Sequence, residues 1–187
     1  MAAGDIDLQQ ILRSPGRLCV NPTNLATAWP HGGTGIGAVG TQQFSPNPMY
    51  GVIPDEAKQN VTDVVFIGFR PIFRALLRQP YDLSVIQRFW PNSTIGSVSG
   101  RRVITIPHAS LPPGTLMSTV AAAFLFTPYD QLRDYGIYFP KGIPLVAREL
   151  ELEYSLAAEL ALRVEIVPID DASGRNVVWG PLVDMTL

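Results

Sequence analysis

The residues that could do chemistry in this 187-residue chain begin with a glycine-rich stretch. Residues 35–40, Gly-Ile-Gly-Ala-Val-Gly, satisfy the G-x-G-x-x-G pattern of dinucleotide-binding loops, and Asp55 follows at the separation of a ribose-binding acid. That fingerprint needs a strand before the first glycine and a helix after the last, because the helix N-terminus binds the pyrophosphate. Pro30 precedes the stretch, and Pro46 and Pro48 follow it. The flanking sequence therefore argues against a nucleotide site.

Other candidate catalytic and metal-binding groups are few. His31 and His108 are the only histidines, and neither has a second ligand at metal-binding spacing. Ser110 lies near His108 but not in a strained nucleophile turn. Cys19 is the single cysteine and falls in an expected strand, where it fits as a small buried group. We therefore expect no catalytic residue, no cofactor and no metal site.

Three acids alternate along one expected strand. Glu149, Glu151 and Glu153 lie on one strand face, with neighbouring acids about 7 Å apart. Paired carboxylates could perform acid–base catalysis. A solvated strand face opposite a core is the simpler explanation and the one we prefer. A third interpretation is that this row, repeated around a ring, lines a channel and repels DNA phosphates.

The elements that must position these groups are mainly strands. The chain contains 16 Gly and 17 Pro, which are incompatible with long helices over most of its length. Apolar and polar residues alternate over residues 149–167, and we follow this period of two over the helical propensity of Glu, Leu and Ala. Further strands are expected over residues 16–20, 61–69, 102–106, 116–127 and 176–180. The strand over 176–180 is expected to lie beside the strand that ends at residue 167. Short helices are expected over residues 72–79 and 82–90.

Residues 21–60 are expected to form an extended, Gly/Pro-rich interaction arm. No Asp, Glu, Lys or Arg occurs from Leu18 to Pro54. Loops longer than about 12–15 residues are commonly functional or disordered, and the aromatic content here argues against disorder. We therefore predict that the arm docks on a neighbouring subunit. The predicted interface residues are Trp29, Pro30, His31, Gly33, Phe44, Pro46 and Tyr50.

The charge composition narrows the class of partner. Charged residues make up only 16% of the chain and the formal net charge is −2, so no global field attracts nucleic acid or an anionic membrane. No apolar run reaches the ~18 residues of a membrane span, and residues 1–7 lack a secretory signal, which predicts synthesis in a cytoplasm. Twelve of the fourteen basic residues are Arg, a composition typical of interfaces that a GC-rich genome would also produce.

Two regions of the chain resemble the tail tube proteins of tailed bacteriophages, and together they cover about half of it. The first region consists of residues 16–18 (Gly-Arg-Leu), 21–25 (Asn-Pro-Thr-Asn-Leu), 30–34 (Pro-His-Gly-Gly-Thr) and 36–37 (Ile-Gly). The second consists of residues 124–128 (Phe-Leu-Phe-Thr-Pro), 139–144 (Phe-Pro-Lys-Gly-Ile-Pro) and 167–171 (Val-Pro-Ile-Asp-Asp), before Gly180.

The resemblance implies one mainly β domain over residues 1–187, an antiparallel sandwich or barrel-like subunit with one or two short helices and a long N-terminal arm. Such subunits form rings, expected to be hexameric, which stack into the channel that conducts DNA without binding it specifically. Other tail and neck proteins would be its partners, its place would be the virion, and it would have no enzymatic activity. Glu149, Glu151 and Glu153 become candidate lumen residues.

Two alternatives stay open. The first is another virion protein: a neck, tail terminator or capsid decoration protein, which would bind a portal or capsid and would not polymerise alone. The second is a small nucleotide-binding enzyme that uses the glycine-rich segment.

Overall fold

The computed structural model of the chain describes residues 15–55, 60–77, 83–90, 92–106, 114–130, 135–146, 162–185 and 187. These ranges are mainly β, with antiparallel pairing throughout and one short α-helix, which confirms the predicted fold class at that level. The strands are β1 (Gly16–Val20), β2 (Thr34–Ser45), β3 (Pro48–Asp55), β4 (Asn60–Phe69), β5 (Ile72–Leu77), β6 (Thr94–Val98), β7 (Arg101–Thr105), β8 (Ala122–Pro128), β9 (Gly136–Val146), β10 (Leu162–Pro168) and β11 (Val178–Gly180). The helices are α1 (Leu83–Phe89) and the 3-10 segments η2 (Met117–Val120) and η3 (Leu182–Asp184).

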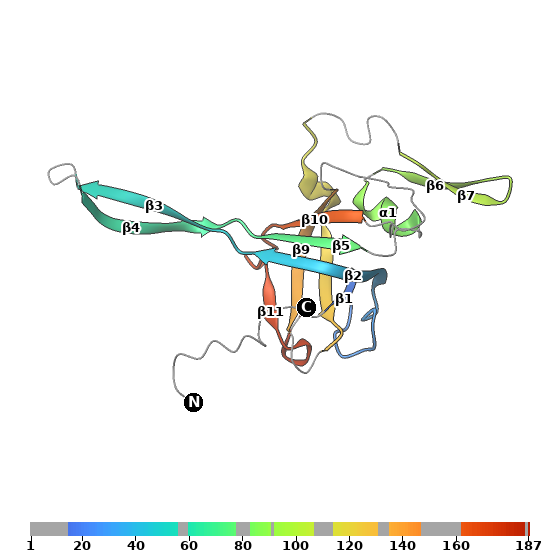
Figure 1. The fold of residues 1–187 in the computed structure, drawn as a ribbon, viewed down its shortest axis with the longest axis horizontal. Helices are drawn as coiled ribbons and strands as arrows, with labels where there is room; N and C mark the ends of the chain where they lie inside the picture. Colours follow the sequence, from blue (N-terminus) through green and yellow to red (C-terminus); the bar gives the residue numbers. More distant parts are fainter. Residues whose placement is uncertain are drawn as a thin grey trace.

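Six strands close into a barrel (Figure 1). Their order is β10-β5-β2-β1-β8-β9, and β9 pairs with β10 to complete the circle. Strand β11 is added beside the first residues of β9. A strand within residues 176–180 is therefore present, but its predicted place beside β10 is wrong. Both edges of β10 are already paired, one with β5 and the other with β9.

Aromatic rings fill the barrel interior. The ring of Phe73 in β5 lies 5.7 Å from that of Phe126 in β8, centroid to centroid, and 5.3 Å from that of Phe139 in β9. Phe89 of α1 stacks on Phe124 at 6.4 Å. All five side chains are buried. Strands that lie far apart in the sequence are thus joined by one set of ring contacts, which burial of apolar area stabilises.

Strand β5 corrects the helix predicted over residues 72–79. Its burial alternates, with Phe73, Ala75 and Leu77 inside the barrel, and it pairs with β2 on one edge and β10 on the other. The good helical propensity of its Arg, Ala and Leu residues is a weak preference that tertiary pairing overrides.

Most other predicted elements lie where the pattern placed them. The strands expected over 16–20, 61–69 and 102–106 and the helix over 82–90 are confirmed by β1, β4, β7 and α1. The alternation that predicted a strand ending at Val167 is confirmed by β10, in which every second side chain is buried. The strand predicted over 116–127 begins only at Ala122, because residues 117–120 form η2. Residues 147–161 lie outside the described ranges.

Residues 21–60 do not form one irregular arm in the part of the chain that the structure describes. Strand β2 is a barrel strand, and β3 is one half of a hairpin. Residues 21–33 form an irregular loop, which turns back on its own barrel. The backbone N–H of Asn21 donates to the carbonyl of Ala123 at 2.8 Å, and that of Thr23 donates to the carbonyl of His31 at 2.9 Å. The scarcity of charge here reflects a barrel strand and an apolar hairpin.

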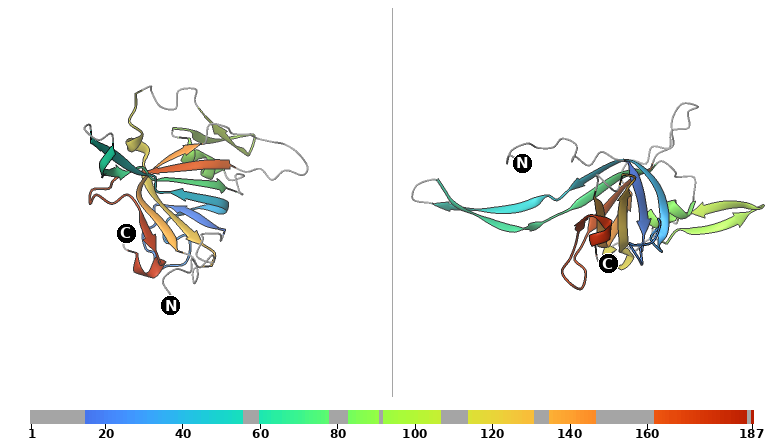
Figure 2. Two further views of the ribbon diagram at one scale, coloured as in Figure 1. Left: turned by 60° about the vertical axis from the view of Figure 1, so that its left-hand side comes forward. Right: turned by 90° about the horizontal axis from the view of Figure 1, so that it is seen from below.

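Two hairpins project from the barrel (Figures 1 and 2). Strands β3 and β4 continue β2 and β5 outward and form what we call the long ribbon. Strands β6 and β7 form the short ribbon, a separate two-stranded sheet near α1. The two ribbons point away from the barrel in opposite directions, as the right-hand view of Figure 2 shows most clearly.

Candidate functional site

The long ribbon is apolar on both of its faces. Directly paired residues share a face, so the pairs Tyr50–Phe66 and Val52–Val64 occupy one face, and Val65 lies on the other. Its large apolar side chains, each between 41 and 65% exposed, are Met49, Tyr50, Val52, Ile53, Val64, Val65, Phe66, Ile67 and Phe69.

Local contacts give this ribbon a defined shape. The ring of Phe66 lies 5.9 Å from that of Tyr50 across the ribbon and 4.9 Å from that of Phe69, both edge-on. At the base of the ribbon, the backbone N–H of Arg70 donates to the carbonyl of Asn47 at 3.0 Å, and Asn47 Nδ2 donates to the carbonyl of Arg70 at 3.2 Å. Cross-strand aromatic pairs of this kind stabilise a hairpin modestly.

Burial of the exposed side chains of the long ribbon by a partner would contribute a large free energy. An antiparallel sheet that faces water keeps one polar face, and an isolated two-stranded hairpin is at best marginally stable. Complete burial of one large apolar side chain contributes about 1.5–3 kcal/mol, so a half-exposed one leaves about 1 kcal/mol that a partner could add. Nine such side chains leave on the order of 10 kcal/mol. Exposed apolar patches of this extent mark interaction surfaces.

The short ribbon ends in a tight turn beside two cations. Ser99 (φ 50°) and Gly100 (φ 75°) both have left-handed backbones, as a two-residue type I′ hairpin turn requires. Arg101 and Arg102 follow the turn directly and are exposed. Its exposed apolar residues, with the residue that follows β7, are Val98, Val103 and Ile106.

Several predicted interface residues lie against the chain's own barrel. His31 is only 3% exposed, and its Nε2 lies 3.1 Å from Oγ1 of Thr127 in β8. A Cβ on Gly33 would lie 2.5 Å from the carbonyl oxygen of Val20. Trp29 is half-buried in the same loop. The prediction that His31 faces a neighbour is wrong in this structure, because its side chain is buried against the barrel. Gly33 is partly exposed, so its contact with a neighbouring subunit stays a prediction.

The remaining four predicted interface residues divide by exposure. Pro30 is half-buried in the loop. Phe44 is half-buried against the core, with its ring 6.2 Å from that of Phe139. Pro46 and Tyr50 are exposed, at the start of the long ribbon and on one of its faces. Their contact with a neighbouring subunit stays a prediction.

The structure separates the candidate chemical groups from one another. Residues 35–40 lie inside barrel strand β2, which leads into β3 and not into a helix, and Asp55 ends β3. Cys19 is buried, and burial raises the pKa of its thiol to about 12, so the thiol stays protonated near neutral pH. The candidates that lie outside the described residues are His108, Ser110, Glu149, Glu151 and Glu153.

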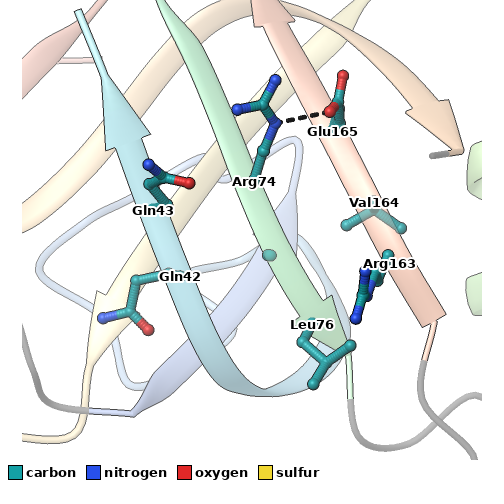
Figure 3. Close-up of a pocket in the computed structure, with 8 residues that line it drawn as sticks. Gln42, Gln43, Arg74, Leu76, Arg163, Val164 and Glu165 are labelled. Atoms are coloured by element: carbon teal, nitrogen blue, oxygen red, sulfur yellow. Dashed lines mark hydrogen bonds and ion pairs between the residues drawn. The ribbon is translucent and has the colours of Figure 1, made fainter.

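A shallow pocket of about 410 Å³ lies across β2, β5 and β10 (Figure 3). In its wall, Nε of Arg74 donates to Oε1 of Glu165 at 2.7 Å, so these two charges neutralise each other. The pocket otherwise offers the Arg163 guanidinium and the amides of Gln42 and Gln43. These groups can bind a polar molecule, but they include no nucleophile paired with a base.

No three His, Cys, Asp or Glu side chains within the described ranges are grouped so that they could hold a metal ion. None of the helices in those ranges is long and apolar enough to cross a membrane. No protein-family model matches the chain, and no curated protein proved similar to it. The long ribbon, with the short ribbon opposite, is the candidate functional site.

Sequence reasoning identified β4 but did not predict that it forms a projecting ribbon with two exposed apolar faces. The signal was the uninterrupted apolar run over residues 64–67, Val-Val-Phe-Ile, because consecutive apolar residues in a strand occupy both faces. In the short ribbon, sequence reasoning identified β7 but missed β6 and the hairpin that joins the two strands. Its signal was the turn dipeptide Ser99-Gly100, followed by Arg101 and Arg102.

Proposed function

We propose that this protein is a structural virion subunit that assembles with copies of itself, and that it forms the rings of a phage tail tube. The observation that carries this proposal is the long ribbon, whose two faces are both apolar and about half exposed. A ribbon of this kind needs cover on two sides. A subunit inside a repeating assembly has such cover, because neighbours lie on more than one side of it.

The magnitudes fit assembly through several contacts. Losing translational and rotational freedom on association costs an estimated 4–15 kcal/mol. The long ribbon supplies on the order of 10 kcal/mol from its nine side chains, which is of the same size. Contacts outside the long ribbon therefore have to contribute as well, and the short ribbon also carries exposed apolar groups, among them Val98 and Val103.

The placement of the glycine-rich segment weakens the enzyme alternative. A phosphate-binding loop presents backbone N–H groups at a helix N-terminus. In β2 the backbone instead pairs with β1, with Gly37 opposite Leu18 and Gly35 opposite Cys19. The tail tube proposal additionally draws on the resemblance of residues 16–37 and 124–171 to tail tube proteins.

Electron microscopy of the purified chain over a concentration series tests the proposal. Tubes of stacked rings are the expected result. Rings that never stack would instead favour a neck or tail terminator protein, and a chain that joins only a capsid lattice would favour a decoration protein. If the chain stays monomeric at concentrations up to about 1 mM, self-assembly is overturned. At that concentration, even an association free energy of about −4.1 kcal/mol would make about half of the chains associate.

A further inference from the structure

The two ribbons carry opposite charge. Strands β3 and β4 contain two acids and no base, a net charge of −2: Asp55 and Asp63. Residues 94–106 contain two bases and no acid, a net charge of +2: Arg101 and Arg102. The whole chain has a net charge of only −2, so this difference is local to the projections.

The charges lie toward the outer ends of both ribbons. Asp63 is exposed and lies opposite Ile53, close to the start of β4, while the base of the ribbon is at Phe69. Arg101 and Arg102 begin β7 directly after the turn that ends the short ribbon. Each ribbon therefore combines exposed apolar side chains with a charge of one sign near its tip.

The ribbons of one chain cannot meet each other, because they project from the barrel in opposite directions (Figures 1 and 2). Two long ribbons in contact would place a net −2 against a net −2, and like charges across an interface are unfavourable. A long ribbon against the short ribbon of another copy joins apolar surface to apolar surface and unlike charge to unlike charge.

We propose that subunits join head to tail, with the long ribbon of one copy docked on the short ribbon of the next. This inference rests on the proposed function, since it names the partner surface for self-assembly. Contacts between unlike surfaces produce a ring when the rotation closes and a helical filament when it does not. The opposite charges of the tips set the direction and register of the contact, and the apolar side chains supply most of its burial.

Two charge-reversed variants test the pairing. The first, Asp55→Lys with Asp63→Lys, changes the long ribbon from −2 to +2 by sequence. The second, Arg101→Glu with Arg102→Glu, changes the short ribbon from +2 to −2. Each variant alone should need a concentration at least about tenfold higher than the natural chain for half-assembly at low salt, because like charges then face each other. The defect should shrink in about 0.5 M salt, where charges on the surface are screened.

An equimolar mixture of the two variants is the decisive arm. When the two variants alternate, the long ribbon of the first (+2) meets the short ribbon of the second (−2). The long ribbon of the second (−2) then meets the short ribbon of the first (+2), so every contact joins unlike charges. We expect the mixture to assemble within about threefold of the natural chain, as should one chain carrying all four changes. Asp170→Lys, at an exposed position after β10 and outside both ribbons, is the control and should assemble normally.

The outcomes separate this pairing from self-assembly itself. If the natural chain assembles and the mixture gives no rescue, the ribbon pairing is wrong and self-assembly stands. Variants that assemble like the natural chain would also overturn the pairing. If the natural chain never assembles, both proposals fail. Thermal unfolding of each variant checks that the barrel is intact, and the chain with all four changes distinguishes a lost contact from a folding defect.

Discussion

Replacing two paired-face residues of the long ribbon, Val64→Ser with Phe66→Ser, should weaken assembly without unfolding the subunit. Both side chains lie on one face of the ribbon, and Phe66 is the ring that contacts both Tyr50 and Phe69. Neither side chain reaches the barrel core, which is built around rings such as Phe73.

The size of the effect follows from exposure. Val64 is 52% and Phe66 51% exposed, so assembly can still bury about half of each side chain. At about 1.5–3 kcal/mol for complete burial, each half is worth about 1 kcal/mol, or about 2 kcal/mol for the pair. Since 1.4 kcal/mol is a factor of ten, the association constant of each contact should fall about 30-fold.

Sedimentation velocity over a concentration series measures this change, and thermal unfolding checks the barrel. Val183→Ser is the control, because Val183 is 89% exposed in η3 and lies outside both ribbons. Its assembly should stay within about threefold of the natural chain, since one exposed side chain that stays exposed contributes little. A folded double variant that assembles as the natural chain does would refute the role given to the ribbon.

Three further predictions concern the fold of the single subunit. Gly35→Val should lower the Tm by about 5 °C, because a Cβ there would lie 2.3 Å from the Trp29 ring and overpacking costs about 1–3 kcal/mol. Cys19 should resist a thiol reagent at about pH 8 in the native protein and react after denaturation, because burial raises its pKa to about 12. The free energy of unfolding should fall as the pH rises above about 9, because there the thiol ionises only in the unfolded chain. Asp171 accepts the backbone N–H of Arg175, which lowers its carboxyl pKa, so the Tm difference between the natural chain and Asp171→Asn should shrink as the pH falls below about 4.

The sequence pattern predicted a strand correctly where apolar and polar residues alternate. It failed where the extended conformation depends on pairing with strands that are distant in the sequence. Strand β10 was predicted because Val164 and Ile166 alternate with charged residues. Strand β5 was not, because Arg74, Ala75 and Leu76 favour helix locally, and only the two partner strands make the extended form better. Closure of the barrel could not be predicted, since it depends on β9 reaching β10 and β8 at once, a pairing with no local signal.

The sequence predicted that residues 21–60 contain an interaction surface, but it did not predict correctly which of these residues form that surface. The absence of charge from Leu18 to Pro54 pointed to residues 21–60 as an interaction segment, and Tyr50 lies on the surface that the structure exposes. His31 was assigned to the same surface because composition cannot tell a loop that turns back on its own barrel from one that reaches outward. That distinction depends on long-range contacts, such as the one between His31 and Thr127.

Closure of the barrel also decides where assembly can occur. A closed sheet has no free edge between its strands, so the six barrel strands cannot extend by pairing with another subunit. In the described part of the chain, open edges lie on the short strand β11 and on the two ribbons, which are separate two-stranded sheets. The ribbons also carry the exposed apolar groups and the opposite charges. Stability of the subunit and contact between subunits are therefore assigned to different residues, and substitutions in a ribbon should change one with little effect on the other.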